Sequence, residues 1–317
     1  MKSSFINNTH VEGYVFSHTL QKRVSKKGVT YIAGDINVAT VDDFTNVVPV
    51  HFTYVTETFK SGKPNPTFEL LTELIESGAA KTAENCGKDA LKVRIDGDVE
   101  VNDFVTREGE MASPKRVRGS FAHAMTNEIA ENPATFDVDM LIANVAEREF
   151  ENDSYVTLRG YVFNFRGEAL PVEFNVRSEG GMNYFLDQEV SNKKPMFTHI
   201  KGEIVSQAIV NETVEESAFG ESIVRKSIRN LRTWDVTWAA VEPYEWDDDS
   251  TMTKKEFKQK LDEREEHLAE VKRNHDEYQA SRNGGQNFAA AKESPKVQQK
   301  VEVASDDEED DDDEFPF

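Results

Sequence analysis

The sequence predicts a mainly β protein with two tandem five-stranded barrels, followed by a charged helix and a disordered acidic tail. Three observations predict this fold class. The chain contains an internal repeat, each repeat holds five strand-like segments around one helix, and the composition changes after about Trp246. Residues before that point are rich in Val, Ile, Phe and Tyr, enough to bury a core, whereas apolar residues become sparse beyond it.

The repeat is clearest in two strands that share a Pro-Val-x-Phe pattern. Residues 47–53 (VVPVHFT) resemble residues 169–175 (ALPVEFN). A strand-like run with a central glycine precedes each of them, at residues 30–36 and 156–162. A small barrel must bend its strands sharply, and glycine tolerates the bulge that does this. We therefore expect both glycines to lie at bends of a barrel wall.

A helix and two further strands complete each repeat. Residues 68–75 predict a helix in the first repeat, and a weaker helix spans roughly 182–190 in the second. Alternating segments follow at 91–99 and 197–205, and each repeat then reaches a final strand through an acidic loop and a basic cluster. This order of elements matches the oligonucleotide/oligosaccharide-binding (OB) barrel. The alternative is two unrelated β-rich domains that share common strand residues.

The residues after the second repeat predict a helix and then an unstructured end. Phe257 to Tyr278 show heptad spacing, interrupted by Arg264 and His275, which predicts an amphipathic helix docked on the second barrel, or else a weak coiled coil between subunits. The expected domains are a first OB-type barrel (1–125), a linker (126–138), a second OB-type barrel (139–246), a charged helix (247–282), a flexible linker (283–304) and an acidic tail (305–317).

The negative charge is distributed unevenly along the chain. The formal net charge is -22, of which residues 305–317 supply nine acidic and no basic residues. Residues 247–304 carry a net charge of -2, which leaves -11 for residues 1–246. The folded part is thus acidic in its own right. An anionic ligand would therefore need a locally positive groove, because the field of the whole protein opposes its approach.

Basic clusters recur at equivalent positions of the two repeats. Ligands of OB barrels cross the second and third strands, between the loop that joins strands one and two and the loop that joins strands four and five. The basic residues expected at this groove are Lys22, Arg23, Lys26, Lys27, Lys115, Arg116, Arg118, Arg225, Lys226, Arg229 and Arg232. Such charges neutralise phosphates and make binding depend on salt.

Aromatic side chains accompany the basic residues in the second repeat. Arg159, Tyr161, Phe163 and Phe165 share one face of a strand whose opposite face is aliphatic. An outward aromatic face predicts a platform on which bases stack, and burial against the other barrel or a subunit partner is the alternative. Trp234, beside the basic cluster, could contact DNA or pack in the core, whereas we expect Trp238 to pack in the core. Because the two residues are four apart on one strand, we expect their rings on the same side.

The first repeat lacks aromatic residues at the equivalent outward positions. Tyr14, Phe16 and His18 on its first strand are the expected substitutes. Phe52 and Phe174 share their faces with valines of the Pro-Val-x-Phe strands, so we expect both rings in the barrel cores.

The acidic tail closes in a distinctive motif of seven residues: Asp311, Asp312, Asp313, Glu314, Phe315, Pro316 and Phe317. A charge run alone is typical of a solubilising tail, but two phenylalanines around a proline suit a small pocket with a basic rim. The motif resembles the tip of bacterial and phage single-stranded-DNA-binding proteins, although Glu314-Phe315 departs slightly from the usual tip.

The resemblance implies a tip that recruits replication and repair proteins and competes with DNA for the basic groove. The commonest members of that family have one barrel per chain and form tetramers. Two barrels in one chain would therefore imply fewer subunits, a monomer or a homodimer, and the unusual layout suggests a phage-encoded member.

The remaining patterns argue against an enzyme. One cysteine, Cys86, excludes an intrachain disulfide and a cysteine-based zinc site, and the seven histidines show no metal-ligand spacing. The chain has no phosphate loop, nucleophile elbow or dinucleotide fingerprint. We expect no catalysis, no cofactor and no metal. With no apolar run of membrane length and no signal-peptide pattern, we expect no membrane contact and a cytoplasmic location, in a bacterium or a phage-infected host.

The function expected from these patterns is sequence-independent binding and protection of single-stranded DNA in replication, recombination or repair, with the acidic tip recruiting partner proteins. The alternative is an acidic protein-interaction module, for example a DNA mimic that inhibits a DNA-binding enzyme. Side chains alone do not separate DNA from RNA as the ligand.

Overall fold

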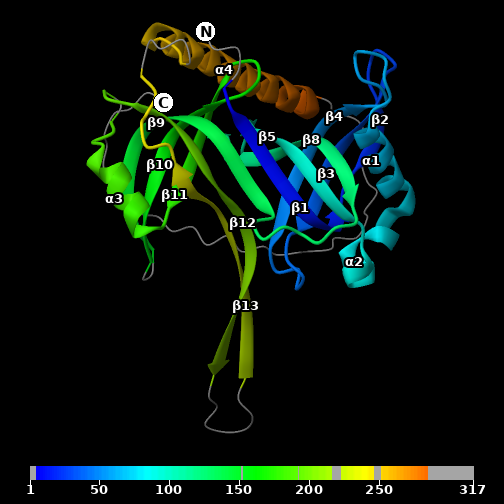
Figure 1. Ribbon diagram of the computed structural model, residues 1–317. Coiled ribbons are helices and arrows are strands. Elements are labelled where there is room, and N and C mark those ends of the chain that lie inside the picture. Colours follow the sequence, from blue (N-terminus) through cyan, green and yellow to red (C-terminus); the bar gives the residue numbers. More distant parts are fainter. Residues whose placement is uncertain (1–4, 151–152, 192, 216–222, 246–250, 285–317) are drawn as a thin grey trace. The chain divides into compact units, whose positions relative to one another are not determined.

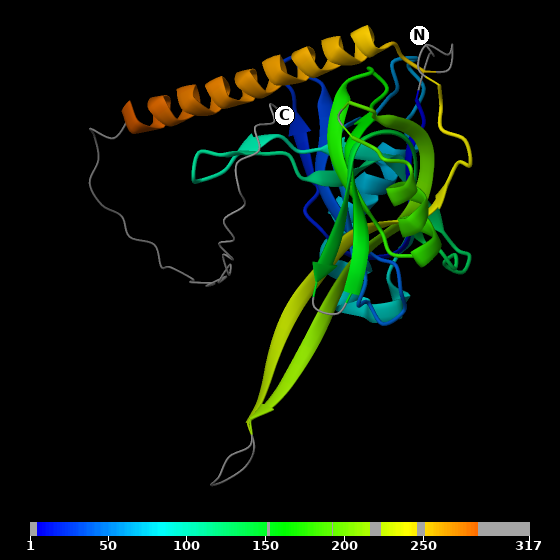
Figure 2. The ribbon, with the colours of Figure 1, turned by 90° about the vertical axis from the view of Figure 1, so that its left-hand side faces the viewer.

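The computed structural model describes residues 5–150, 153–191, 193–215, 223–245 and 251–284, and the side chains of residues 150, 208–230 and 282–284 are not part of that description (Figures 1 and 2). Two compact units divide the chain, Met1–His275 and Asp276–Phe317. Both repeats belong to the first unit. The flexible linker expected from residue 283 and the acidic tail expected at 305–317 lie beyond the described residues, except for residues 283 and 284.

The first repeat forms a closed barrel. Its five strands are β1 (Asn7–His18), β3 (Thr30–Ala39), β4 (Val47–Thr56), β5 (Lys92–Val101) and β8 (Lys115–Met125). Strand β1 pairs with both β3 and β5, β5 pairs with β8, and β8 runs parallel to β4. Helix α1 (Pro66–Ser77) connects β4 to β5 and is capped by the Asn65 side chain, which accepts the Thr67 N–H. These connections are those of an OB barrel.

Short elements decorate the first barrel. They are β2 (Gln21–Val24), η1 (Gly78–Lys81), α2 (Ala83–Cys86), η2 (Gly87–Asp89), β6 (Phe104–Val105) and β7 (Met111–Ala112). Strand β2 pairs with β3 in the connection between the first two barrel strands, and β6 pairs with β7 to form a small hairpin between β5 and β8. Both loops that flank an OB ligand groove are therefore built up in this barrel.

The second repeat closes in the same way. Its elements are β9 (Ala134–Phe150), β10 (Asp153–Phe163), β11 (Ala169–Val176), α3 (Glu179–Asp187), β12 (Met196–Glu215) and β13 (Ile223–Ala239). Strand β9 pairs with β10 and β12, β12 pairs with β13, and β13 runs parallel to β11. The predicted fold class, two tandem OB-type barrels, is confirmed. Figure 1 shows that β12 and β13 continue past the barrel as a long hairpin.

Glycines bend the barrel walls as expected. The pairing shifts by one residue between Ile32 and Gly34 in β3, and between Arg159 and Gly160 in β10. Gly34 has a φ of 137°, which disfavours any residue with a Cβ. At Gly160 a Cβ would collide with the Leu141 carbonyl oxygen of the neighbouring strand. The prediction that these glycines lie at bulges is confirmed.

The two barrels share one sheet. Residues 7–11 of β1 pair antiparallel with residues 134–138 of β9, so the sheet runs from one barrel into the next. Strand β9 therefore takes up the last residues of the segment 126–138 that the sequence suggests as a linker.

The prediction for the barrel cores is confirmed, since the side chains of Phe52 and Phe174 are 0% and 1% exposed. Phe174 stacks on Phe136 from β9, with ring centroids 4.6 Å apart.

Helix α4 (Lys254–Gly284) packs on both barrels through residues of the first unit. It begins with a capping box, in which the Thr253 hydroxyl accepts the Glu256 N–H and the Glu256 carboxylate accepts the Thr253 N–H. Phe257 packs edge-on against Tyr161 of β10, and Arg264 pairs with Asp103 beside β6. The expected docked helix is therefore present, with contacts to the first barrel as well as the second.

Asp139 of β9 joins the N-terminal segment before β1 to β12 and to the segment that follows β13. Its carboxylate is fully buried and accepts the Ile6 N–H at 2.9 Å and the Tyr244 hydroxyl at 3.1 Å, and its Oδ1 lies 2.9 Å from His199 Nδ1. Desolvation, together with the nearby Asp139 charge and this hydrogen bond, raises the pKa of Tyr244 to about 12.

We expect one tyrosine to ionise near pH 12 in an ultraviolet alkaline titration, and this step should be missing in Tyr244→Phe. Because the folded pKa is raised above the usual 10.0, the stabilisation from this group is complete below pH 10.0 and is lost as the pH rises through about 12. Identical titration curves for the two proteins would contradict the role of Asp139.

Candidate nucleic-acid interface

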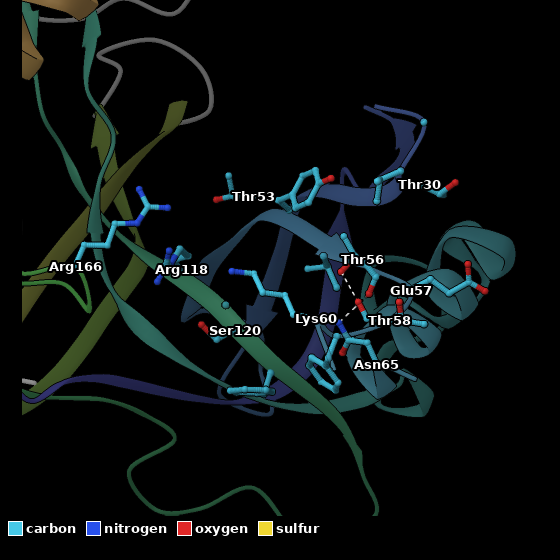
Figure 3. Close-up of a pocket in the computed structure, with 17 residues that line it drawn as sticks. Thr30, Thr53, Thr56, Glu57, Thr58, Lys60, Asn65, Arg118, Ser120 and Arg166 are labelled. Atoms are coloured by element: carbon cyan, nitrogen blue, oxygen red, sulfur yellow. Dashed lines mark hydrogen bonds between the residues drawn. The ribbon is translucent and has the colours of Figure 1, made fainter. Parts of the chain in front are cut away.

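A groove of about 890 Å³ lies on the ligand face of the first barrel (Figure 3). Its walls are residues 28–30 after β2, residues 53–60 at the end of β4, and residues 118–121 of β8, together with Asn65 and Arg166. Residues 28–30 and 53–60 belong to the first loop and the third strand that OB barrels use for ligands, whereas residues 118–121 belong to the fifth strand. Arg166 comes from the loop between β10 and β11 of the second barrel.

Exposed aromatic rings line this groove. Tyr54 is 50% exposed, Phe121 49% and Phe59 38%. Tyr31 packs on Tyr54 with ring centroids 4.4 Å apart, which holds the Tyr54 ring in place. Rings that are left uncovered on a soluble domain mark an interaction surface, and flat rings in a groove suit the stacking of bases.

Cations outnumber carboxylates among the groove residues. Lys60, Arg118 and Arg166 face a single acidic lining residue, Glu57. In Figure 3, Lys60 extends from the β4–α1 loop toward the end of the groove where Arg118 and Arg166 lie. Arg118 is oriented by Asp98, whose Oδ1 accepts its Nε–H at 2.8 Å. Arg118 is also ion-paired with Asp98, and Arg166 lies 3.8 Å from Glu168. Lys60 is therefore the one lining cation that has no carboxylate partner among the described residues.

The first-loop cations lie next to this groove. Lys22 and Arg23 are exposed on β2, and Lys26 and Lys27 are exposed in the turn that leads to the groove residues 28–30. Within the described chain, none of these four side chains forms an ion pair with a carboxylate. The Lys22 ammonium lies 5.3 Å from the ring centroid of Phe68, and the other three charges are open to phosphates.

The second basic cluster is split by its surroundings. Arg118 lines the groove, whereas Arg116 pairs with Glu100 at 2.8 Å. The Lys115 ammonium lies 5.7 Å from the ring centroid of Phe174 and 5.9 Å from that of Trp234. Desolvation there lowers the pKa of Lys115. Lys115 therefore packs where the barrels meet and does not line the groove.

We expect Lys115→Met to leave the salt dependence of DNA binding unchanged, while Arg118→Gln lowers its slope by about one. Because the pKa of Lys115 is lowered from 10.5, the buried charge costs stability at neutral pH, and the stability of the native protein rises with pH just below 10.5. Lys115→Met should remove that rise. Affinity titrations at stepped salt measure the salt slope, and urea unfolding at two pH values measures the pH dependence of the stability. A smaller salt slope in Lys115→Met would show that this lysine contacts the DNA.

The expected aromatic platform of the second barrel is wrong in part. Phe163 is fully buried against Phe5 and Phe197, and Tyr161 is half-covered by Phe257 of α4. Arg159 stays exposed but pairs with Glu173 at 2.7 Å. The two rings are covered, but by the N-terminal segment and α4 and not, as the alternative interpretation had it, by the other barrel or a subunit partner.

The two tryptophans of β13 are exchanged relative to expectation. Trp234 is buried beside Phe136 and Phe174, whereas Trp238 is 48% exposed. A register shift between Lys201 and Gly202 of the paired strand β12 lies between them. The expected same-side placement of these rings is therefore wrong, because a bulge reverses which face a residue occupies.

The last basic cluster lies on the β12–β13 hairpin. Arg232 is exposed where the hairpin joins the barrel. The backbone of Arg225, Lys226 and Arg229 belongs to β13, but their side chains fall outside the described part of the structure, as does the whole tip from Asp311 to Phe317. Their roles stay predictions from the sequence.

A family model described as YorF matches residues 6–274. This chain belongs to the YorF family. Two solved structures of the single-stranded DNA binding protein from Thermus aquaticus are similar to this YorF-family chain. The wild-type structure has 13% identity and a TM-score of 0.46, and covers 78% of this chain and 97% of its own. A deletion mutant has 12% identity and a TM-score of 0.46, covering 77% and 98%. No curated protein is significantly similar to the chain.

Several groove residues of this YorF-family protein escape sequence reasoning. Tyr54, Phe59 and Phe121 carry the exposed rings, whereas Tyr14, an expected substitute, is 8% exposed and packs edge-on against Phe44. Thr53 and Tyr54 are both exposed between the buried Phe52 and Val55, so the alternation breaks at this point. The signal was weak, since an aromatic residue next to a break in alternation has no preferred face.

The described residues show two further features of this YorF-family chain. Among them, no three His, Cys, Asp or Glu side chains are grouped so that they could hold a metal ion. None of the described helices has the length and apolar character needed to cross a bilayer.

Proposed function

We propose that this protein binds and protects single-stranded DNA, without sequence preference, in replication, recombination or repair, and that the strand lies in the groove of the first barrel. The observation that carries the proposal is the combination of exposed Tyr54, Phe59 and Phe121 with Lys60, Arg118 and Arg166 in one groove. Rings accept the faces of any base, and cations accept phosphates, so neither contact requires a particular sequence.

The charge of the groove favours this function over a DNA mimic. A mimic presents carboxylates where DNA presents phosphates, whereas Glu57 is the single acidic residue among those lining the groove. The exposed Lys26 and Lys27 beside the groove add to its positive charge. Since residues 1–246 carry a net charge of -11, the local reversal of sign would guide a strand to this face and discourage it elsewhere.

The recruitment of replication and repair proteins by the acidic tip forms the second part of the proposal. It is supported by the sequence of residues 311–317 and their resemblance to the tips of single-stranded-DNA-binding proteins. A phage-encoded monomer or homodimer acting in the host cytoplasm fits this role. Deletion of residues 314–317 should leave DNA binding intact or tighter and abolish recruitment, and a clear loss of DNA affinity would contradict the assignment.

The function is tested by titrating the full chain against labelled oligo-dT and a duplex of the same length at stepped salt. We expect tighter binding to the single strand at every salt concentration, and an affinity that falls linearly with the logarithm of salt. Equal affinity for the duplex would reject the proposal. Oligo-rU in the same series separates DNA from RNA.

A further inference from the structure

We propose that Phe165 and Arg166, on the β10–β11 loop of the second barrel, extend the groove of the first barrel, so that one nucleic-acid strand contacts both barrels. The inference rests on the proposed function and adds a path for the strand. Arg166 already lines the groove, and all other lining residues belong to the first barrel. The ring of Phe165 is 69% exposed.

Two guanidinium groups, one from each barrel, lie near the ring of Phe165. The Arg118 Cζ is 5.6 Å from its ring centroid and the Arg166 Cζ is 5.3 Å from it. Arg118 is fixed in turn by Asp98, which accepts its Nε–H at 2.8 Å. An exposed ring with two cations beside it suits a nucleotide, because a base can stack on the part of the ring that stays open while the arginines meet the neighbouring phosphates.

The loop that carries Phe165 is ordered before any ligand arrives. The Asn164 side chain accepts the Arg166 N–H at 2.9 Å and the Glu168 N–H at 3.0 Å, and Gly167 closes the turn with a φ of 73°. A ring on such a turn loses little conformational freedom on binding. The turn therefore presents Phe165 outward in a fixed place.

The aromatic residues that precede Phe165 on β10 are covered, whereas Phe165, in the loop after the strand, is exposed. Tyr161 and Phe163, which precede it on β10, are covered by Phe257 of α4 and by Phe5. The covering segments leave Phe165 open, on the side where Arg118 contributes to the groove. The aromatic face of β10 is thus closed over most of its length and exposed at the end next to the groove.

The test compares two lengths of labelled oligo-dT, about 8 and about 20 nucleotides, since one OB fold occupies about 4–16 nucleotides. We expect Phe165→Ala to weaken binding of the longer strand about tenfold and of the shorter strand less than about twofold. Tyr54→Ala should weaken both, and Trp238→Ala, a control for loss of an exposed ring outside the groove, should weaken neither.

The possible outcomes distinguish the proposed strand path across both barrels from the proposed binding of single-stranded DNA. Loss of affinity with Tyr54→Ala but none with Phe165→Ala overturns the shared path and leaves the proposed function standing. Equal losses on both lengths with Phe165→Ala place this ring inside the first barrel's own site and also overturn the extension. Failure of the unaltered protein to prefer single strands rejects the proposed function itself. As an independent readout, Phe165→Trp should gain fluorescence that the longer oligo-dT quenches, and an unquenched signal contradicts stacking.

Discussion

Replacing both Tyr54 and Phe121 with alanine is expected to weaken binding to oligo-dT by about a hundredfold. Each base stacked on an aromatic ring contributes about 1–3 kcal/mol, so the loss of two platforms multiplies to this range. Both rings are about half exposed, so their removal opens no cavity in the core. Fluorescence anisotropy at one salt concentration measures the loss, and thermal unfolding should give an unchanged Tm.

The salt dependence of this variant distinguishes stacking from a general loss of the site. Lys60, Arg118 and Arg166 remain in place, so the slope of affinity against salt should be unchanged while the affinity itself falls. Trp238→Ala is the matched control, because this ring is 48% exposed on the second barrel and contacts His199 and Lys201. A loss below about threefold in the double variant would mean that bases do not stack in this groove.

Replacing Arg264 with alanine is expected to lower the free energy of unfolding by about 3 kcal/mol, because it removes the arginine from a largely buried carboxylate that keeps, among the described residues, only Ser113 and His267 as partners. Both side chains of the Arg264–Asp103 pair are largely buried, at 10% and 8% exposure. Arg264 binds Asp103 with two N–H groups and also reaches Ser113 Oγ at 3.2 Å. Denaturant unfolding measures the loss, and hydrogen exchange along α4 shows whether the helix detaches first.

The same pair predicts a dependence on pH. Desolvation acts to raise the pKa of Asp103, but hydrogen bonds from Arg264 and Ser113 together with the charge of Arg264 prevail and lower it from 3.8. The stabilisation is therefore complete above pH 3.8 and is lost as the pH falls through the lower folded value. Arg264→Ala should lack this acid-dependent loss.

Two further variants control this measurement. Arg273→Ala removes an exposed arginine from the same helix and should change the stability by less than about 0.5 kcal/mol. The double variant Asp103→Ala with Arg264→Ala should recover part of the loss, since it removes the unpaired charge. Unchanged unfolding of Arg264→Ala would show that the ion pair does not anchor α4.

Sequence reasoning succeeds here where the determinants are local. The Pro-Val-x-Phe strands place Phe52 and Phe174 in the cores because alternation over a short strand fixes the face. The central glycines mark the bulges because no other residue tolerates the close approach of the next strand at Gly160. Order and spacing of the elements then suffice for two OB barrels.

The site was harder to predict because it depends on distant segments. Phe163 is buried by Phe5, and Tyr161 by Phe257, which lie far from β10 in the sequence. Trp238 points outward because a bulge at Thr237, between Val236 and Trp238 of β13, changes its face. Neither the partner that covers a ring nor the position of every bulge can be read from one strand's own pattern.

The residues of the groove show both what the sequence predicts correctly and what it does not. The first-loop cations Lys26 and Lys27 were expected and lie beside it, but Lys115 and Arg116 are diverted to the barrel joint and to Glu100. Arg116 and Arg118 share one face of β8 and both pair with carboxylates of β5, but the groove reaches only residues 118–121 of this strand, so Arg118 alone of this cluster lines it. Arg166 was missed, since it comes from the other barrel.

Photocrosslinking of oligo-dT that carries 5-iodouracil, followed by mapping of the modified peptides, tests most directly whether the strand lies along the first barrel. The expected crosslinks are to Tyr54, Phe59 and Phe121, the exposed rings of the groove. Crosslinks confined to Trp238 or to the β12–β13 hairpin, with none at these three rings, would contradict the assignment of the groove as the binding site.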